Sequence, residues 1–211
     1  MGTVISARGL IESPVLDIMP AALRGGVVFS DFFSRDRSEV VGSENDGEGG
    51  GLISQWRGDL NRANVSGGVL LIDGNGRFTV GVSPGLINVG IEIKIASLPN
   101  QSAFLDIKKD GFLGTPDCYR LIFRTGSEPN AALIKRIDGA TTYLTPFHYG
   151  FEAGSTIGVQ YSHGFLRLLI NGRVVEQVYD DTLHSAIGFA SISGDSGGNG
   201  LAVSEFIVYG A

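Results

Sequence analysis

The stretch IGVQYSHGFLRLLINGRVVEQV, residues 157–178, decides the fold class of this chain. Apolar side chains alternate along 166–170, and a period of two is typical of a strand with one buried face. The Asn-Gly pair at 171–172 is the signature of a type I′ hairpin turn, and the His-Gly pair at 163–164 marks another turn just before it. The stretch therefore predicts an antiparallel meander of three strands.

The rest of the chain shows the same patterns of strands and turns. Residues 88–96, NVGIEIKIA, alternate apolar with polar or small side chains, and Asp-Gly pairs at 73–74, 110–111 and 138–139 separate further short strands. The chain has 32 glycines in 211 residues, about twice the usual ~7%. Glycine disfavours helices, and no amphipathic helix is evident to make the crossovers that a parallel sheet needs. We therefore expect an all-β fold, a two-sheet antiparallel β-sandwich.

Composition excludes several function classes. The net charge is −6 and the pI is near 5.0, whereas nucleic-acid binders usually carry basic patches. The single cysteine, Cys118, excludes an internal disulfide framework and is expected to be a small buried residue. No apolar run approaches the ~20 residues that span a bilayer, and no signal peptide is visible. We therefore expect no nucleic-acid or membrane partner, and synthesis in the cytoplasm.

The first 25 residues differ from the rest of the chain. Pro14 and Pro20 interrupt any long helix, and apolar side chains occur there without a regular period. A segment too apolar for a solvated tail, yet without a fold of its own, is expected to dock on a surface. We divide the chain into an irregular N-terminal arm, 1–25, and a β-sandwich domain, 26–211. The arm packs either on its own domain or on a neighbouring subunit.

Four short motifs stand in the order found in a known family. They are DFFSR at 31–35, a hairpin of the form L-x-x-x-x-N-G-x-x-V at 166–175, IGF at 187–189 and VSEFIV at 203–208. Together they resemble the concanavalin A-like (laminin-G-like) jelly-roll domain over about 27–210. The resemblance implies that the first and last strands lie side by side. Phe33 and Phe206 would then share one core, and Asp31 and Arg35 would pair near its rim.

Domains of this family occur in lectins, polysaccharide-active enzymes, adhesins and bacteriophage tail proteins. The glycine-rich composition and the missing signal peptide are most similar to the phage group. Our leading hypothesis is a non-enzymatic virion component, a minor tail or tail-tip protein that contacts host surface carbohydrate. Its N-terminal arm would join it to other virion proteins, and a symmetric homo-oligomer would add avidity to weak sugar contacts. The alternatives are a polysaccharide-active enzyme or its carbohydrate-binding module, and a purely structural decoration protein.

Aromatic side chains are the candidates for carbohydrate binding, because their faces stack on sugar rings while nearby polar groups bond the hydroxyls. The single tryptophan stands in a glycine-rich context, and a loop-like stretch at 141–151, TTYLTPFHYGF, holds a cluster of rings. Alternatively, the tryptophan belongs to the core and the cluster caps the edge of the sandwich. The candidate residues are Trp56, Tyr143, Phe147, His148 and Tyr149.

An acidic loop at 43–51, SENDGEGGG, is a candidate calcium site. Alternating carboxylates around a glycine turn suit a hard cation that takes six to eight oxygen ligands. The candidate ligands are Glu44, Asp46 and Glu48. The loop lacks the full EF-hand pattern, so a solvated turn remains the alternative, and no other cofactor is expected.

Two catalytic patterns fail on inspection. GDSGG at 194–198 matches the string around a serine-protease nucleophile, but the three histidines lie close before it and the expected downstream proline is Asn199. Glycosidases of the jelly-roll family carry E-x-D-x-E or E-x-D-x-x-E on one strand, whereas Asp106 is followed by lysines. No catalytic residue is assigned.

Overall fold

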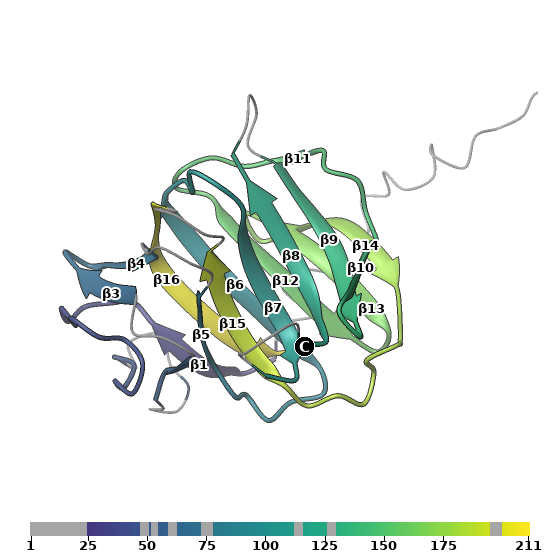
Figure 1. Cartoon of the computed structure of the whole chain (residues 1–211), viewed down its shortest axis with the longest axis horizontal. Helices are drawn as coiled ribbons and strands as arrows, with labels where there is room; N and C mark the ends of the chain where they lie inside the picture. The colour runs from purple at the N-terminus through teal and green to yellow at the C-terminus, as the bar shows by residue number, and fades with distance from the viewer. Residues whose placement is uncertain are drawn as a thin grey trace, which may run out of the picture.

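The computed structural model describes residues 25–46, 51, 55–58, 63–72, 78–111, 116–125, 130–194 and 200–211. These residues form only strands, turns and loops, arranged as two antiparallel sheets that face each other (Figure 1). The expectation of an all-β sandwich is confirmed. No helix in the described ranges is long and apolar enough to cross a membrane. The arm, 1–25, falls almost wholly outside the described residues.

The first sheet, sheet 1, contains the first and last strands of the domain. Its order in space is β14 (Arg173–Tyr179), β13 (Phe165–Ile170), β12 (Thr156–Ser162), β6 (Val89–Ser97), β16 (Leu201–Gly210), β4 (Val69–Ile72) and β3 (Ala63–Ser66), and β1 (Val27–Asp31) also pairs with β16.

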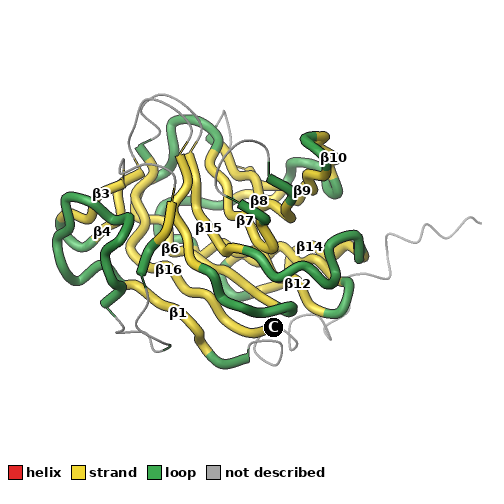
Figure 2. The backbone as a smooth tube through the Cα atoms, turned by 60° about the horizontal axis from the view of Figure 1, so that its bottom comes forward, coloured by secondary structure: helices red, strands yellow, loops and turns green. Residues whose placement is uncertain are grey.

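The second sheet, sheet 2, supplies the opposite layer. Its order is β10 (Ala140–Tyr143), β9 (Asn130–Ile137), β8 (Cys118–Arg124), β7 (Ala103–Lys109), β15 (Phe189–Gly194), β5 (Phe78–Val82) and β2 (Arg57–Gly58), and β11 (Tyr149–Gly150) also pairs with β9. Figure 2 shows β16, β6 and β12 along one side of the molecule and β15, β7 and β8 along the other.

The core lies between the two sheets because the inward positions of each strand are apolar. Ile91, Ile93 and Ile95 of β6 are buried there, as the alternation of 88–96 predicts. The outer face of sheet 1 is also closely filled: a Cβ on Gly90 would come within 2.4 Å of the Tyr209 ring. Glycine is required at that position because the tyrosine lies directly over it.

The first and last strands lie side by side, as the family resemblance implies. Strand β1 pairs with β16 in antiparallel register, and Phe33 and Phe206 both belong to the core. One detail is wrong: the carboxylate of Asp31 pairs with Arg37 at 2.8 Å, while Arg35 donates to the carbonyl of Asn45 at 3.1 Å. Phe33 has a φ of 58°, so the chain is not extended there and residues 31 and 35 do not share a side.

The two hairpin turns that the sequence predicts within 157–178 are present, and each borders a hollow described below; the Asp-Gly pair at 73–74 lies outside the described residues. Asn171 and Gly172 have φ values of 51° and 76°, which is the positive-φ pair of a type I′ turn. His163 and Gly164, with φ values of 51° and 84°, form the corresponding turn at the other end of β13. The meander of 157–178 is therefore confirmed as β12, β13 and β14.

Candidate carbohydrate-binding site

Trp56 lies in the core rather than on a binding surface. It is only 1% exposed, its ring centroid is 4.7 Å from that of Phe206, and its indole nitrogen donates to the carboxylate of Asp31 at 2.7 Å. A ring so enclosed presents no face to a sugar. The polar residues next to Trp56 in the sequence suggested an exposed position. The carboxylate that pairs with its indole could not be predicted, because it comes from a strand distant in the sequence.

Tyr143 and Phe147 form an aromatic pair at the edge of sheet 2. Tyr143 is 59% exposed and stands opposite Ile134 of β9, and its ring centroid lies 5.8 Å from that of Phe147. The guanidinium of Arg124 lies 3.9 Å above the Phe147 ring. This cation–π contact uses one face of Phe147, so Tyr143 is the more available ring of the pair.

His148 and Tyr149 form a separate pair at the start of β11. Their ring centroids are 4.1 Å apart, and the hydroxyl of Tyr149 donates to the carboxylate of Glu176 at 2.5 Å. Burial raises the pKa of Tyr149, and the neighbouring Glu176 carboxylate raises it further. The phenol therefore stays protonated, and its bond to β14 holds the ring in one orientation.

A hollow of about 460 Å³ separates this second pair from sheet 1. His148 and Tyr149 line one side, and Asn171 and Arg173 from the β13–β14 turn line the other. The side-chain oxygen of Asn171 accepts a hydrogen bond from the backbone of Thr156 at 2.9 Å, which fixes the turn. The hollow thus combines aromatic rings with amide and guanidinium groups, the mixture that suits an amphipathic ligand such as a sugar.

Sequence reasoning found the aromatic side of this hollow and missed the polar side. The sequence predicts Asn171 only as a turn residue, and it predicts no role for Arg173 or Glu176. The chain separation is more than twenty residues, and the two sides belong to different sheets. Only the packing of the two sheet edges brings them together.

A charged cluster occupies the outer face of sheet 2. Asp106 of β7 is fully buried and accepts hydrogen bonds from Arg120 at 2.6 and 2.8 Å, and Lys109 lies 3.4 Å from the same carboxylate. Burial alone would raise the pKa of Asp106, but Arg120 and then Lys109 outweigh it and hold the pKa below its ordinary value. At neutral pH the carboxylate is therefore the ionised partner of two cations.

Cys118 has the structural role that the sequence predicts. It is buried, and burial raises the pKa of its thiol, so the reactive thiolate is not formed at neutral pH.

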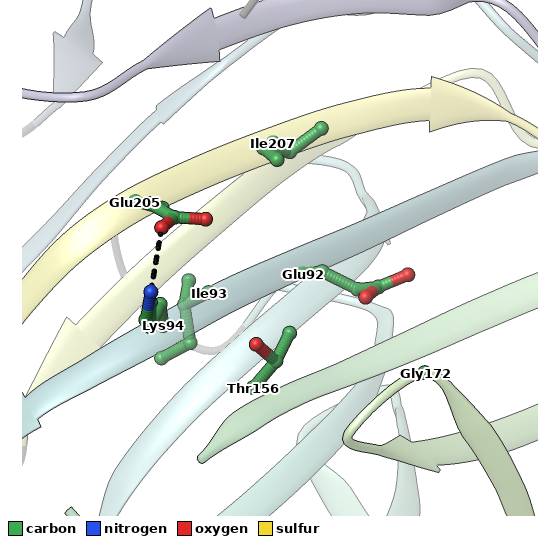
Figure 3. A pocket seen from close by; sticks show the side chains of 7 residues that line it. All are labelled: Glu92, Ile93, Lys94, Thr156, Gly172, Glu205 and Ile207. Atoms are coloured by element: carbon green, nitrogen blue, oxygen red, sulfur yellow. Dashed lines mark hydrogen bonds and ion pairs between the residues drawn. The ribbon is translucent and has the colours of Figure 1, made fainter. Parts of the chain in front are cut away.

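A third group of side chains lines a smaller hollow on the outer face of sheet 1 (Figure 3). Its volume is about 160 Å³, and it holds two carboxylates, Glu92 of β6 and Glu205 of β16. Lys94 donates to Glu205 at 3.1 Å, while the Glu92 carboxylate extends away from this ion pair. The two acids stand on adjacent strands, offset by two residues in the register.

The candidate calcium ligands lie in the loop that follows β1. One oxygen of Asp46 accepts hydrogen bonds from the backbone nitrogens of Phe32 at 2.9 Å and Ser34 at 3.1 Å, which gives this carboxylate a role in shaping the loop. The side chain of Glu44 is exposed, and Glu48 lies outside the described residues, as do 195–199 of the GDSGG string. Among the residues that are described, no three His, Cys, Asp or Glu side chains gather in a metal-binding arrangement.

No protein-family model and no curated protein matches this sequence. Solved structures do match. LamAcat from Zobellia galactanivorans is 12% identical with a TM-score of 0.61, covering 90% of this chain and 99% of that one. The carbohydrate-binding module CBM66 from Bacillus subtilis is 11% identical with a TM-score of 0.52, covering 88% and 98%.

A third similar structure is the CBM2 module of the evolved Dit of Lactobacillus casei BL23 phage J-1. It is 8% identical with a TM-score of 0.53, covering 88% of this chain and 95% of that one. At these identities the likeness shows the fold alone. The chain therefore has the concanavalin A-like jelly-roll fold that glycoside hydrolases and carbohydrate-binding modules share.

Proposed function

We propose that this protein is a non-enzymatic carbohydrate-binding component of a bacteriophage particle, a minor tail or tail-tip protein that contacts host surface polysaccharide. The observation that carries the binding role is the hollow between β11 and the β13–β14 turn. The rings of His148 and Tyr149 offer apolar faces to the C–H groups of a sugar. Asn171 and Arg173 offer donors to its hydroxyls from the opposite side.

The chemistry of β7 supports binding without cleavage. A glycosidase needs two carboxyl groups, one of which carries a proton to the leaving oxygen. Strand β7 holds a single carboxylate, Asp106, and the residues that follow it include Lys108 and Lys109 in place of further acids. Since Arg120 keeps Asp106 ionised, this residue has no proton to donate.

The virion role rests on composition and on analogy. The CBM2 module of a phage Dit protein is among the solved structures similar to this chain. In our proposal residues 1–25 attach the domain to other virion proteins and the particle presents several copies. Linked copies convert weak sugar contacts into stable attachment, because each later binding event is intramolecular.

The test is binding of the full chain to purified bacterial cell-wall polysaccharides. We expect saturable binding that Tyr149→Ala and Arg173→Ala each weaken at least tenfold. Arg57→Ala removes an exposed arginine of β2, far from the hollow in the sheet order, and is the matched control. A folded protein that binds no polysaccharide would favour the structural decoration protein, and a protein that stays monomeric and joins no particle would contradict the virion role.

One observation favours the enzyme alternative: Glu92 and Glu205, on neighbouring strands, line the same hollow. A glycosidase needs at least two carboxyl groups in its active site. If they act as a catalytic pair, the protein releases reducing ends from a polysaccharide and Glu92→Gln abolishes that release. We expect no release from the unmodified protein, because Lys94 engages Glu205 and this hollow is much smaller than the one beside His148 and Tyr149.

A further inference from the structure

The opposite end of the β13–β14 hairpin carries another hollow, of about 340 Å³. It lies at the His163-Gly164 turn, whereas the first hollow lies at the Asn171-Gly172 turn. The six residues of β13 between these turns span about 20 Å, so the two hollows are separate. Its main lining residues are Ile87, Asn88, Tyr161, His163, Tyr179 and Asp181.

The floor of this hollow holds an unpaired hydroxyl. Tyr161 is 1% exposed, and its hydroxyl has no hydrogen-bond partner in the described part of the chain. Burial raises the pKa of Tyr161; the backbone amide of Gly164 opposes this rise, but an amide N–H leaves the phenol's own hydrogen without an acceptor. A buried donor without an acceptor is destabilising by about 1–3 kcal/mol, so a ligand oxygen that accepts this hydrogen recovers that free energy.

The wall of the hollow is an exposed aromatic ring held in place. Tyr179 is 62% exposed, packs edge-on against Phe165 with centroids 5.4 Å apart, and donates to the carboxylate of Asp181 at 3.2 Å. A Cβ on Gly164 would come within 2.6 Å of this ring, so only glycine leaves room for it. The ring is therefore positioned before any ligand arrives.

The loop that closes the hollow is tied to the scaffold from two directions. Asp180 pairs with Lys135 of β9 at 2.5 Å and accepts a hydrogen bond from Tyr119 of β8 at 2.7 Å. Lys108 of β7 donates to the carbonyls of His184 at 3.1 Å and Ala186 at 2.8 Å. Because the loop is fixed, a ligand loses little affinity to ordering it.

We propose that this hollow is a second carbohydrate site, which takes one neutral sugar ring. The exposed Tyr179 ring and Ile87 provide the apolar side, and Tyr161 donates to a sugar oxygen that reaches the floor. The carboxylate of Asp181 accepts from hydroxyls and repels acidic sugars. The inference does not rest on the first hollow, since the two share no lining residue.

The test follows the aromatic NMR resonances of Tyr161 and Tyr179 during titration of the full chain. The probes are methyl β-glucoside, methyl β-galactoside and N-acetylglucosamine, with glucuronic acid as the charged comparison. We expect at least one neutral sugar to shift both residues, and glucuronic acid to shift them less. No shift by any neutral sugar up to about 100 mM, far above the millimolar range of weak sites, would overturn the proposal.

Two variants separate binding from folding. Tyr161→Phe removes only the unpaired hydroxyl, so we expect unchanged or higher stability together with about tenfold weaker sugar binding. Tyr179→Ala should weaken binding further, since it removes the exposed ring. Stability that falls in Tyr161→Phe while affinity holds would assign the hydroxyl a structural role and refute ours. Tyr149→Ala, in the other hollow, should leave the Tyr179 titration unchanged, so failure of either site is distinguishable.

Discussion

The indole nitrogen of Trp56 donates a 2.7 Å hydrogen bond to the buried carboxylate of Asp31, and the same carboxylate pairs with Arg37 at 2.8 Å. This contact joins the segment before β2 to the first strand of the domain. It shows why the single tryptophan of the chain is a structural residue: its ring fills the core and its polar edge satisfies a buried acid.

Truncation of Trp56 should therefore unfold the protein rather than remove a ligand contact. We expect Trp56→Ala to lower the free energy of unfolding by about 3–5 kcal/mol, since it leaves a cavity and removes one hydrogen-bond donor from the buried carboxylate of Asp31. Urea denaturation followed by circular dichroism measures this loss. A Trp56→Ala protein that keeps its stability but loses polysaccharide binding would return Trp56 to the binding surface.

Removal of the Asp106 charge should destabilise the protein strongly. Asp106→Asn removes the negative charge that faces the buried Arg120 and Lys109, and breaking a buried ion pair in this way costs about 3–5 kcal/mol. Asp110→Asn, at an exposed position on the same segment, is the control and should shift the urea midpoint little. Equal stability of the two variants would show that the cluster contributes nothing to the fold.

The lowered pKa of Asp180 leads us to expect a loss of folding stability in acid. Burial opposes ionisation, but bonds from Lys135, Thr182 and Tyr119 lower the pKa of Asp180 from 3.8 to about 2. A depressed acid pKa stabilises the folded state above the unfolded pKa, and this contribution disappears as the pH falls from about 4 to about 2. Urea unfolding should show Asp180→Asn about 2 kcal/mol less stable than the unmodified protein at pH 6, with the gap closing by pH 2. A gap that is the same at both pH values contradicts the assignment.

The lowered pKa of Lys108 leads us to expect a change in folding stability at alkaline pH. Burial lowers the pKa of Lys108 from 10.5 to about 8, so between these values the unfolded chain holds a proton that the folded chain has released. The free energy of unfolding should therefore rise with pH across that window as far as this group is concerned. Because other groups titrate there too, the measurement is the difference between the unmodified protein and Lys108→Met at pH 7.5 and 9.5. We expect this difference to grow in favour of the unmodified protein; a constant difference would mean that the lysine is not desolvated.

Much of the fold could be predicted from the sequence, because the residue pattern of a single strand or turn is enough to recognise it. The alternation around Ile91 and Ile93 predicted a strand, although β6 is buried on both faces rather than one. The Asn171-Gly172 pair predicted a hairpin, because each pattern depends only on residues within a few positions. The motif at 31–35 placed Phe33 in the core beside the last strand. It mispaired Asp31 with Arg35, since the left-handed backbone at Phe33 changes which side chains share a face.

Only part of the candidate sites could be predicted from the sequence. Tyr149 stood out by its aromatic neighbours, whereas its bond to Glu176 and its position across from Arg173 depend on the packing of two sheet edges. The hollow around Tyr161 gave no sequence signal at all. Its hydroxyl stands out only in the folded protein, where no described residue accepts its hydrogen.

The resemblance to the jelly-roll family implied that the two ends of the domain pair, whereas the sequence by itself determined the all-β class and the turns that reverse the chain. These depend on side-chain period and on glycine at positive φ, both of which are local properties. Only the tertiary structure decided which aromatic rings are buried and which face a hollow. That choice depends on contacts between residues far apart in the chain, and a ring such as Trp56 or Tyr179 has the same local chemistry in either setting.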